Sequence, residues 1–143
     1  MKSTILLRIA SVLSFIHAAL HTAGGMFGGP KSAEQVAARE AVQSHRFVIF
    51  GVNRSYWDFY FGFGLVACIT LLLLSVLLWQ LASLAKTNPN KARPFVATLL
   101  VAFVAMAVIS KVYFFAPPFV METVITILIA VAFFFLQKEV ISA

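Results

Sequence analysis

Two histidines, His17 and His21, stand four positions apart in an apolar stretch near the start of the chain. Residues with this spacing share one face of a helix, so the two imidazoles can act together. Such a pair could bind a metal ion or exchange protons near neutral pH, and a single histidine could ligate haem. The alternative is a hydrogen-bonding contact between helices. A zinc site would need further ligands, which only His45, Asp58 or Glu122 could supply, so we predict no metal centre.

Other ionisable and polar side chains fall towards the same end of the predicted spans. These are Arg54, Asp58, Lys111, Tyr113 and Glu122. Charge inside a membrane is costly and is often functional, so we expect Lys111 to pair with Glu122 or Asp58. In a catalytic hypothesis, His17 or His21 moves a proton while Asp58 or Glu122 orients the reactants or stabilises charge. The alternative is that these residues lie at the interface and extend towards water.

The segment from Tyr56 to Gly64 is unusually aromatic. Its simplest interpretation is a belt of rings at the membrane interface. The functional alternative is an aromatic wall for a flat lipophile, such as a quinone, a sterol-like molecule or a prenyl chain. The ligand-binding residues predicted on that alternative are Arg54, Tyr56, Trp57, Tyr60, Lys111 and Tyr113.

The composition indicates which elements must position these residues. Of the 143 residues, 62% are hydrophobic and 11% are charged, and the mean hydropathy is +0.97. A soluble domain holds about 45–50% apolar and about 25% charged residues. So small a globule cannot bury this much apolar surface, and lipid must be part of the solvent. We therefore predict a single all-α domain, an integral membrane four-helix bundle. Its spans cover about 5–23, 56–84, 95–115 and 119–136.

The segment between the first two spans has a weaker pattern. Small and apolar residues recur at helical spacing from Ala33 to Val48, and Gln35, Arg39, Gln43 and Arg46 fall on the other side. This pattern predicts an amphipathic surface helix over about 32–50, with Ser32 as its N-cap and Gln35 completing a capping box. Glycines and prolines indicate the breaks, at Gly24–Pro30, in a polar turn over 86–94, and in a tight hairpin at Pro117–Pro118.

The charges predict topology and partners. The formal net charge is +6, but the charges are scattered among apolar runs, which favours contact with anionic lipid over nucleic acid. Of the 11 Lys and Arg residues, six fall on the side of both termini and five on the other, diluted by acids. We therefore expect both termini in the cytoplasm of a bacterial inner membrane. Since no A-x-A site follows the first span, we expect that span to be retained rather than cleaved.

Two segments carry a resemblance. Ser14–Gly25 and Arg54–Gly62 resemble a group of small bacterial four-span membrane proteins, and are more distantly similar to the DoxX-like and EXPERA-type families. EXPERA-type sterol isomerases carry a histidine and, four positions later, a glutamate on their first helix. His17 matches that histidine, whereas His21 stands in place of the glutamate. The resemblance implies a four-helix membrane fold with a pocket for a lipophile.

Three functions are compatible with these observations. The favoured one is a non-catalytic protein, either an accessory subunit of a membrane complex or a binder of lipid or another lipophile. Its partners would be membrane lipids, other membrane subunits or a second copy of the chain. The alternative is a membrane enzyme with isomerase-like acid–base chemistry on a lipophilic substrate. A second alternative is a redox element that uses haem or quinone. No complete catalytic motif is present, so we predict no resident cofactor.

Overall fold

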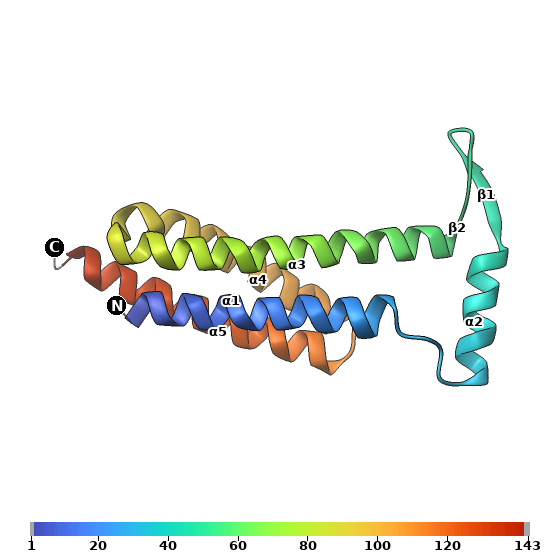
Figure 1. Ribbon diagram of the computed structural model, residues 1–143, viewed down its shortest axis with the longest axis horizontal. Helices are drawn as coiled ribbons and strands as arrows, with labels where there is room; N and C mark the ends of the chain where they lie inside the picture. The colour runs from blue at the N-terminus through green and yellow to red at the C-terminus, as the bar shows by residue number, and fades with distance from the viewer. Residues whose placement is uncertain (1, 142–143) are drawn as a thin grey trace. The chain divides into compact units, whose positions relative to one another are not determined.

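The computed structural model describes residues 2–141, and side chains as far as Lys138. Four long apolar helices pack together, and a short helix and a hairpin lie between the first two, which confirms the predicted fold class (Figure 1). The four helices are long and apolar enough to cross a membrane, so the chain is a small polytopic membrane protein. The elements in order are α1 (Lys2–Leu20), the π-helix η1 (His21–Met26), α2 (Ala33–Ser44), β1 (Arg46–Ile49), β2 (Val52–Ser55), α3 (Tyr56–Thr87), α4 (Pro89–Tyr113) and α5 (Ala116–Ile141).

Contacts divide the described residues into two compact units. Residues 2–17 and 71–141 form the first, called here the bundle unit. Residues 18–70 form the second, called here the hairpin unit. The prediction of a single domain stays a prediction.

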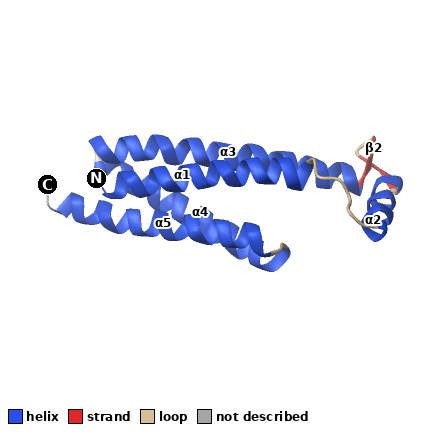
Figure 2. Ribbon diagram, turned by 60° about the horizontal axis from the view of Figure 1, so that its bottom comes forward, coloured by secondary structure: helices blue, strands red, loops and turns tan. Residues whose placement is uncertain are grey.

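The core of the bundle unit follows one face of each helix. Its buried positions recur every three or four residues, as expected for a helix with one packed face. Figure 2 shows α4 and α5 side by side as a pair. The fully buried apolar residues include Leu7 and Ala10 of α1, Leu78 and Ala82 of α3, Val96 and Phe103 of α4, and Ile125 and Ile129 of α5.

Small hydroxyl residues hold α1 against α3 within the bundle unit. Ser11 Oγ donates to the backbone oxygen of Ser75 at 2.7 Å, and Ser75 Oγ donates back to the backbone oxygen of Ser11 at 2.9 Å. One turn away, Ser14 Oγ donates to the backbone oxygen of Leu71 at 3.3 Å. Small side chains let two helix backbones approach closely, and buried hydroxyls in lipid need a partner. This seam therefore combines close packing with paired hydrogen bonds.

The polar segment 86–94 is mostly helical rather than a turn. Helix α3 continues to Thr87, and only Asn88 separates it from α4. Asn88 Oδ1 accepts a hydrogen bond from the backbone N–H of Lys91 at 3.1 Å, so Asn88 is the N-cap of α4. The chain passes from α3 to α4 through this single residue. Pro94 lies in the second turn of α4, inside the helix and not in a turn.

Pro117 and Pro118 begin α5 instead of forming the predicted tight turn. The chain reverses at Phe114 and Phe115, and α5 starts at Ala116. Proline suits the first turn of a helix, because its missing N–H has no partner there and its φ is already helical. The prolines therefore mark the start of a span.

The short helix of the hairpin unit starts as predicted and ends earlier. Ser32 Oγ accepts a hydrogen bond from the backbone N–H of Gln35 at 3.3 Å, and Gln35 Oε1 accepts one from the backbone N–H of Lys31 at 2.7 Å. This is a capping box in which the Gln35 side chain accepts from the N–H of Lys31 and not from that of the N-cap residue Ser32. Helix α2 ends at Ser44, so the prediction of a surface helix to residue 50 is wrong.

Residues 46–55 form an antiparallel β-hairpin instead. Arg46 pairs with Ser55, and Ile49 pairs with Val52 at the end of the ladder. Phe50 and Gly51 make the turn with φ values of +48° and +80°. Two successive residues at positive φ are typical of a type I′ turn, whose twist matches that of the two strands. The turn geometry favours strands over a continued helix at this point.

Candidate binding cleft

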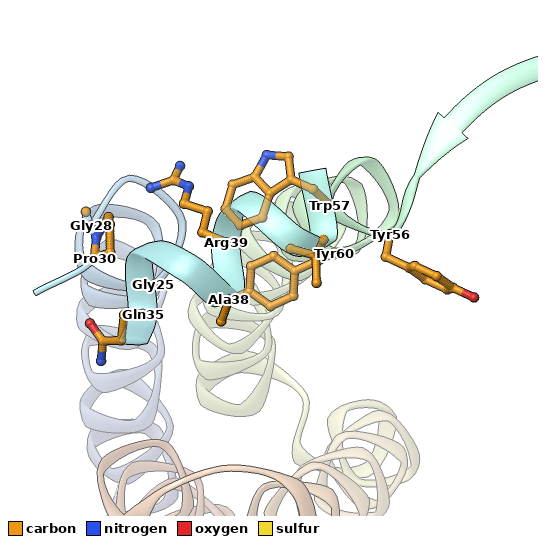
Figure 3. Close-up of a pocket in the computed structure, with 11 residues that line it drawn as sticks. Gly25, Gly28, Pro30, Gln35, Ala38, Arg39, Tyr56, Trp57 and Tyr60 are labelled. Atoms are coloured by element: carbon orange, nitrogen blue, oxygen red, sulfur yellow. The ribbon is translucent and has the colours of Figure 1, made fainter. Parts of the chain in front are cut away.

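A cleft of about 530 Å³ opens within the hairpin unit (Figure 3). Three stretches of chain enclose it: the glycine-rich segment after α1, one face of α2, and the first turns of α3. This volume lies in the range of small-molecule sites. The lining residues are Gly25, Gly28, Gly29, Pro30, Gln35, Ala38, Arg39, Val42, Tyr56, Trp57 and Tyr60.

Helix α3 supplies the aromatic wall. Trp57 and Tyr60 are three positions apart on one helix face, and their ring centroids are 5.4 Å apart. Figure 3 shows both rings beside α2, whereas the ring of Tyr56 extends away from them. The structure thus brings together three of the predicted ligand-binding residues, with Trp57 and Tyr60 as the central pair.

Helix α2 supplies the only charged residue among those lining the cleft, Arg39. Its guanidinium lies over the Trp57 ring, 4.4 Å from the ring centroid, in a cation–π contact. Arg39 is also the only residue of α2 that is not exposed. The sequence pattern put Gln35 and Arg39 on the polar side of this helix, and both line the cleft, although Gln35 is exposed. A planar guanidinium stacks well on an indole face, which accounts for the part-buried position of Arg39.

The glycine segment supplies backbone to the cleft. A Cβ atom at Gly28 would overlap the backbone oxygen of Gly24. A Cβ atom at Gly29 would meet nothing within 4 Å. Gly28 therefore permits a close turn that a larger residue would push open, while Gly29 has free space around it.

His21 begins the π-helix and contacts α3. Its Nε2 lies 3.3 Å from the backbone oxygen of Gly64, which accepts the hydrogen bond. A Cβ at Gly25 would lie 3.3 Å from Nδ1 on the other side of the ring. Met26, at the end of the π-helix, is buried, and a Cβ at Gly64 would overlap its side chain. His21 thus makes the helix contact that the sequence offered as the alternative to catalysis, within a π-helix, a type of element frequent at functional sites.

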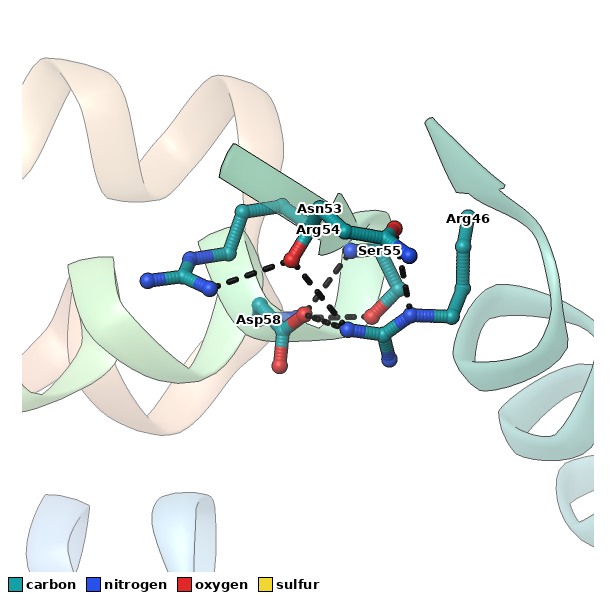
Figure 4. Close-up of polar contacts among 5 residues, drawn as sticks. All are labelled: Arg46, Asn53, Arg54, Ser55 and Asp58. Atoms are coloured by element: carbon teal, nitrogen blue, oxygen red, sulfur yellow. Dashed lines mark hydrogen bonds and ion pairs between the residues drawn. The ribbon is translucent and has the colours of Figure 1, made fainter. Parts of the chain in front are cut away.

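Asp58 belongs to a capping network at the start of α3 (Figure 4). Its Oδ2 accepts from the backbone N–H of Ser55 at 2.8 Å, and its own backbone N–H donates to Ser55 Oγ at 3.2 Å. This reciprocal pair is a capping box. Arg46 Nη2 lies 3.6 Å from the same carboxylate oxygen, and it also donates to the backbone oxygen of Asn53 at 3.2 Å. Asp58 therefore ties the hairpin to α3.

The remaining predicted site residues are not among those that line the cleft. Arg54 donates from Nη1 to the backbone oxygen of Asn53 at 3.0 Å. In the bundle unit, His17 and Glu122 are both buried, and Tyr113 is exposed at the end of α4. Lys111 Nζ lies 5.0 Å from the centroid of the Phe119 ring, in a cation–π contact. The ion pairs predicted for Lys111, and the catalytic roles of the histidines and acids, stay predictions.

Among the residues that the structure describes, no group of three or more His, Cys, Asp or Glu side chains could hold a metal ion. His45, the C-cap of α2, has its Nδ1 2.9 Å from the backbone oxygen of Ala41 in that helix. In the first turn of α2, hydrogen bonds to the Ser32 side chain and to its own backbone lower the pKa of Glu34. Glu34 is therefore ionised at neutral pH, at the helix end that favours negative charge.

No family model, curated protein or solved structure matches the chain. The resemblance to small four-span proteins and to the DoxX-like and EXPERA-type families stays a prediction. The candidate site therefore rests on geometry alone.

Proposed function

We propose that this membrane protein is a non-catalytic binder of a membrane amphiphile whose anionic head lies in the cleft of the hairpin unit. The observation that carries the proposal is the stacking of Arg39 on Trp57 inside a cleft with no other charged lining residue. A single cation in a partly enclosed space attracts a single negative group, because no lining acid opposes it.

Stacking leaves the donor edge of the guanidinium free. Arginine presents a planar fork of N–H groups that fits a carboxylate or a phosphate with two parallel hydrogen bonds. Its face meanwhile stays against the indole. Arg39 can therefore bind an anionic head without losing its contact with Trp57, and the ring fixes where the fork points.

The aromatic and glycine walls suit the less polar part of the same ligand. Tyr60 and Trp57 offer flat apolar surface with a polar tip, the kind of side chain found where one end is apolar and the other is wet. Trp57 is in the first turn of a helix long enough to cross the membrane. This position supports a cleft at the depth of the lipid headgroups, where tryptophan is enriched.

Native mass spectrometry of the gently solubilised protein tests the proposal. We expect the wild-type chain to carry an amphiphile at a fixed ratio, and the Arg39→Gln variant to lose it. Ala38→Phe, which fills the cleft from an exposed helix position, should lose it as well. Lys31→Gln is the matched control, because Lys31 is an exposed basic residue of the same unit that does not line the cleft.

Two results would contradict the proposal. One is the release of bulk lipid only, with no fixed ratio. The other is equal retention of the amphiphile by the Arg39→Gln and Lys31→Gln proteins. A bound protein in place of the amphiphile would favour the role of an accessory subunit.

An enzyme is the second candidate, and one observation favours it. His17 and Glu122 are two titratable side chains buried inside the bundle unit, and buried ionisable groups within membrane spans are typical of functional sites. If this candidate holds, His17→Ala or Glu122→Gln should abolish turnover of the bound lipophile in a protein that still folds. Unchanged turnover in both variants would remove it.

A further inference from the structure

The turn of the β-hairpin places an aromatic residue in a strained position. Phe50 has φ +48° in a turn where asparagine, aspartate or glycine is preferred. A non-glycine residue in this region is uncommon and costs free energy, and such residues cluster at functional sites. The Phe50 side chain is also fully exposed, at 101% of its reference area. The turn therefore holds a phenylalanine where its backbone favours other residues and where no other part of the described chain covers its ring.

The two faces of the hairpin differ in polarity. Cross-strand partners share a face, so Phe47, Ile49, Val52 and Arg54 lie on one face, and Arg46, Val48, Asn53 and Ser55 lie on the other. On the first face, Phe47 packs on Tyr56, with ring centroids 4.9 Å apart. Ile49 and Val52 continue this apolar surface outward with 39% and 45% of their areas exposed. The second face carries the hydrogen bonds that link Arg46 to Asn53.

The direction of the hairpin matches a membrane surface. Figures 1 and 2 both show the hairpin and α2 running crosswise to the first turns of α3, to which β2 connects directly. If α3 crosses the bilayer, a hairpin crosswise to its end runs parallel to the membrane plane. Exposed Arg54 shares the apolar face, and a basic residue beside exposed apolar side chains complements anionic headgroups.

We infer that the hairpin lies in the headgroup layer of the membrane, with Phe50, Ile49 and Val52 inserted towards the acyl chains. Arg54 binds anionic headgroups beside them, and Arg46 stays bound to Asp58 at the base. An interfacial anchor of this kind gains from buried apolar area and from attraction to anionic lipid. This anchor is independent of what the cleft binds.

Environment-sensitive labels on the two faces of the hairpin test the inference. In the full chain with Cys68→Ser, a nitrobenzoxadiazole label is attached at Val52→Cys or at Asn53→Cys. The protein is reconstituted in phosphatidylcholine vesicles with about 30% phosphatidylglycerol, an anionic surface. Some vesicles also hold a lipid with a nitroxide near the headgroup end of its acyl chain. We expect blue-shifted emission and strong nitroxide quenching at position 52, and weaker effects at position 53.

A second variant separates insertion from folding. Phe50→Asn suits the type I′ turn better than phenylalanine, so the hairpin should stay folded, as amide exchange over residues 46–55 can verify. We expect this variant to reduce quenching at position 52, and Phe50→Trp to retain it. Arg54→Gln should remove the dependence of quenching on phosphatidylglycerol.

Two outcomes would overturn the inference. Water-like emission at both positions without quenching would show that the hairpin stands in water. Blue-shifted emission at position 52 without nitroxide quenching would show that a protein surface, such as a second copy of the chain, covers the tip. Neither outcome bears on amphiphile binding in the cleft, which depends on Arg39.

Discussion

Gly28 sets the shape of the cleft at the level of a single residue. In Gly28→Ala the new Cβ would overlap the backbone oxygen of Gly24, which cannot move aside as a flexible side chain can. We expect the substitution to destabilise the protein by about 1–3 kcal/mol, as overpacking does. Gly29→Ala is the matched control, since its Cβ meets nothing within 4 Å, and it should change stability by at most about 0.5 kcal/mol. Thermal unfolding in detergent measures both, and equal midpoints would contradict this account of the turn.

Some single residues of the cleft were predictable from the sequence. Trp57 and Tyr60 were predictable, because three-residue spacing puts two amphipathic rings on one helix face. Arg39 was not predictable as a cleft residue, because the periodicity of small residues in α2 put Arg39 on the opposite side of the helix. A periodicity of alanines is a weak indication of which face of a helix is packed. In the structure, Arg39 stacks on Trp57 instead. The useful signal was an arginine on a short helix that comes before a tryptophan in the first turn of the next long helix.

Asp58 acts at the scale of elements, because it joins the hairpin to the start of α3. In Asp58→Asn the amide loses the charge that faces Arg46 and weakens the cap on Ser55. We expect a loss of about 0.5–2 kcal/mol, as for other helix caps, and faster amide exchange over residues 46–55. Glu40→Gln removes an exposed carboxylate from α2 and serves as the control. Unchanged exchange together with lost activity would instead support the catalytic role predicted for Asp58.

The paired serines hold two elements together. In Ser75→Ala the hydroxyl that donates to the backbone oxygen of Ser11 is lost from a buried seam. Hydrogen bonds between membrane helices contribute about 0.6 kcal/mol on average and up to about 1.7 kcal/mol, so we expect a loss in that range. Ser83→Ala on the same helix removes an exposed hydroxyl bonded only to the backbone of its own helix, at Trp79. Unfolding measured in detergent or bicelles should show a greater loss of stability for Ser75→Ala than for Ser83→Ala. A greater loss for Ser83→Ala would contradict this role of Ser75.

The long helices were predictable as elements, and the hairpin was not. Apolar runs of this length leave few alternatives in lipid, since the backbone must satisfy its own hydrogen bonds there. The two strands within residues 46–55 are too short to show a clear alternation of apolar and polar residues. The turn has phenylalanine at position 50, where asparagine or glycine would have indicated a hairpin. The tight turn predicted at Pro117 and Pro118 was wrong for a related reason, because proline fits the start of a helix as well as a loop.

At the scale of the whole molecule, the distribution of basic residues predicts the topology. The segment Lys86–Arg93 is basic and has no acid, so we expect it to stay in the cytoplasm with both termini. A green fluorescent protein fused to the C-terminus should then fluoresce in cells. A cysteine at Asn53 in the Cys68→Ser protein should react with an impermeant maleimide from outside. The reverse pattern would invert the topology and place the cleft on the cytoplasmic side.

Trp57 reports directly on the binding of an amphiphile in the cleft. The chain has two tryptophans, so Trp79→Phe leaves Trp57 as the only one, 4.4 Å from Arg39. The first measurement is the emission of Trp57 in detergent-solubilised protein during titration with an anionic phospholipid. We expect a saturable change at a fixed ratio that is abolished by Ala38→Phe and by Arg39→Gln but not by Lys31→Gln. A gradual, unsaturable change that is the same in all four proteins would contradict the claim.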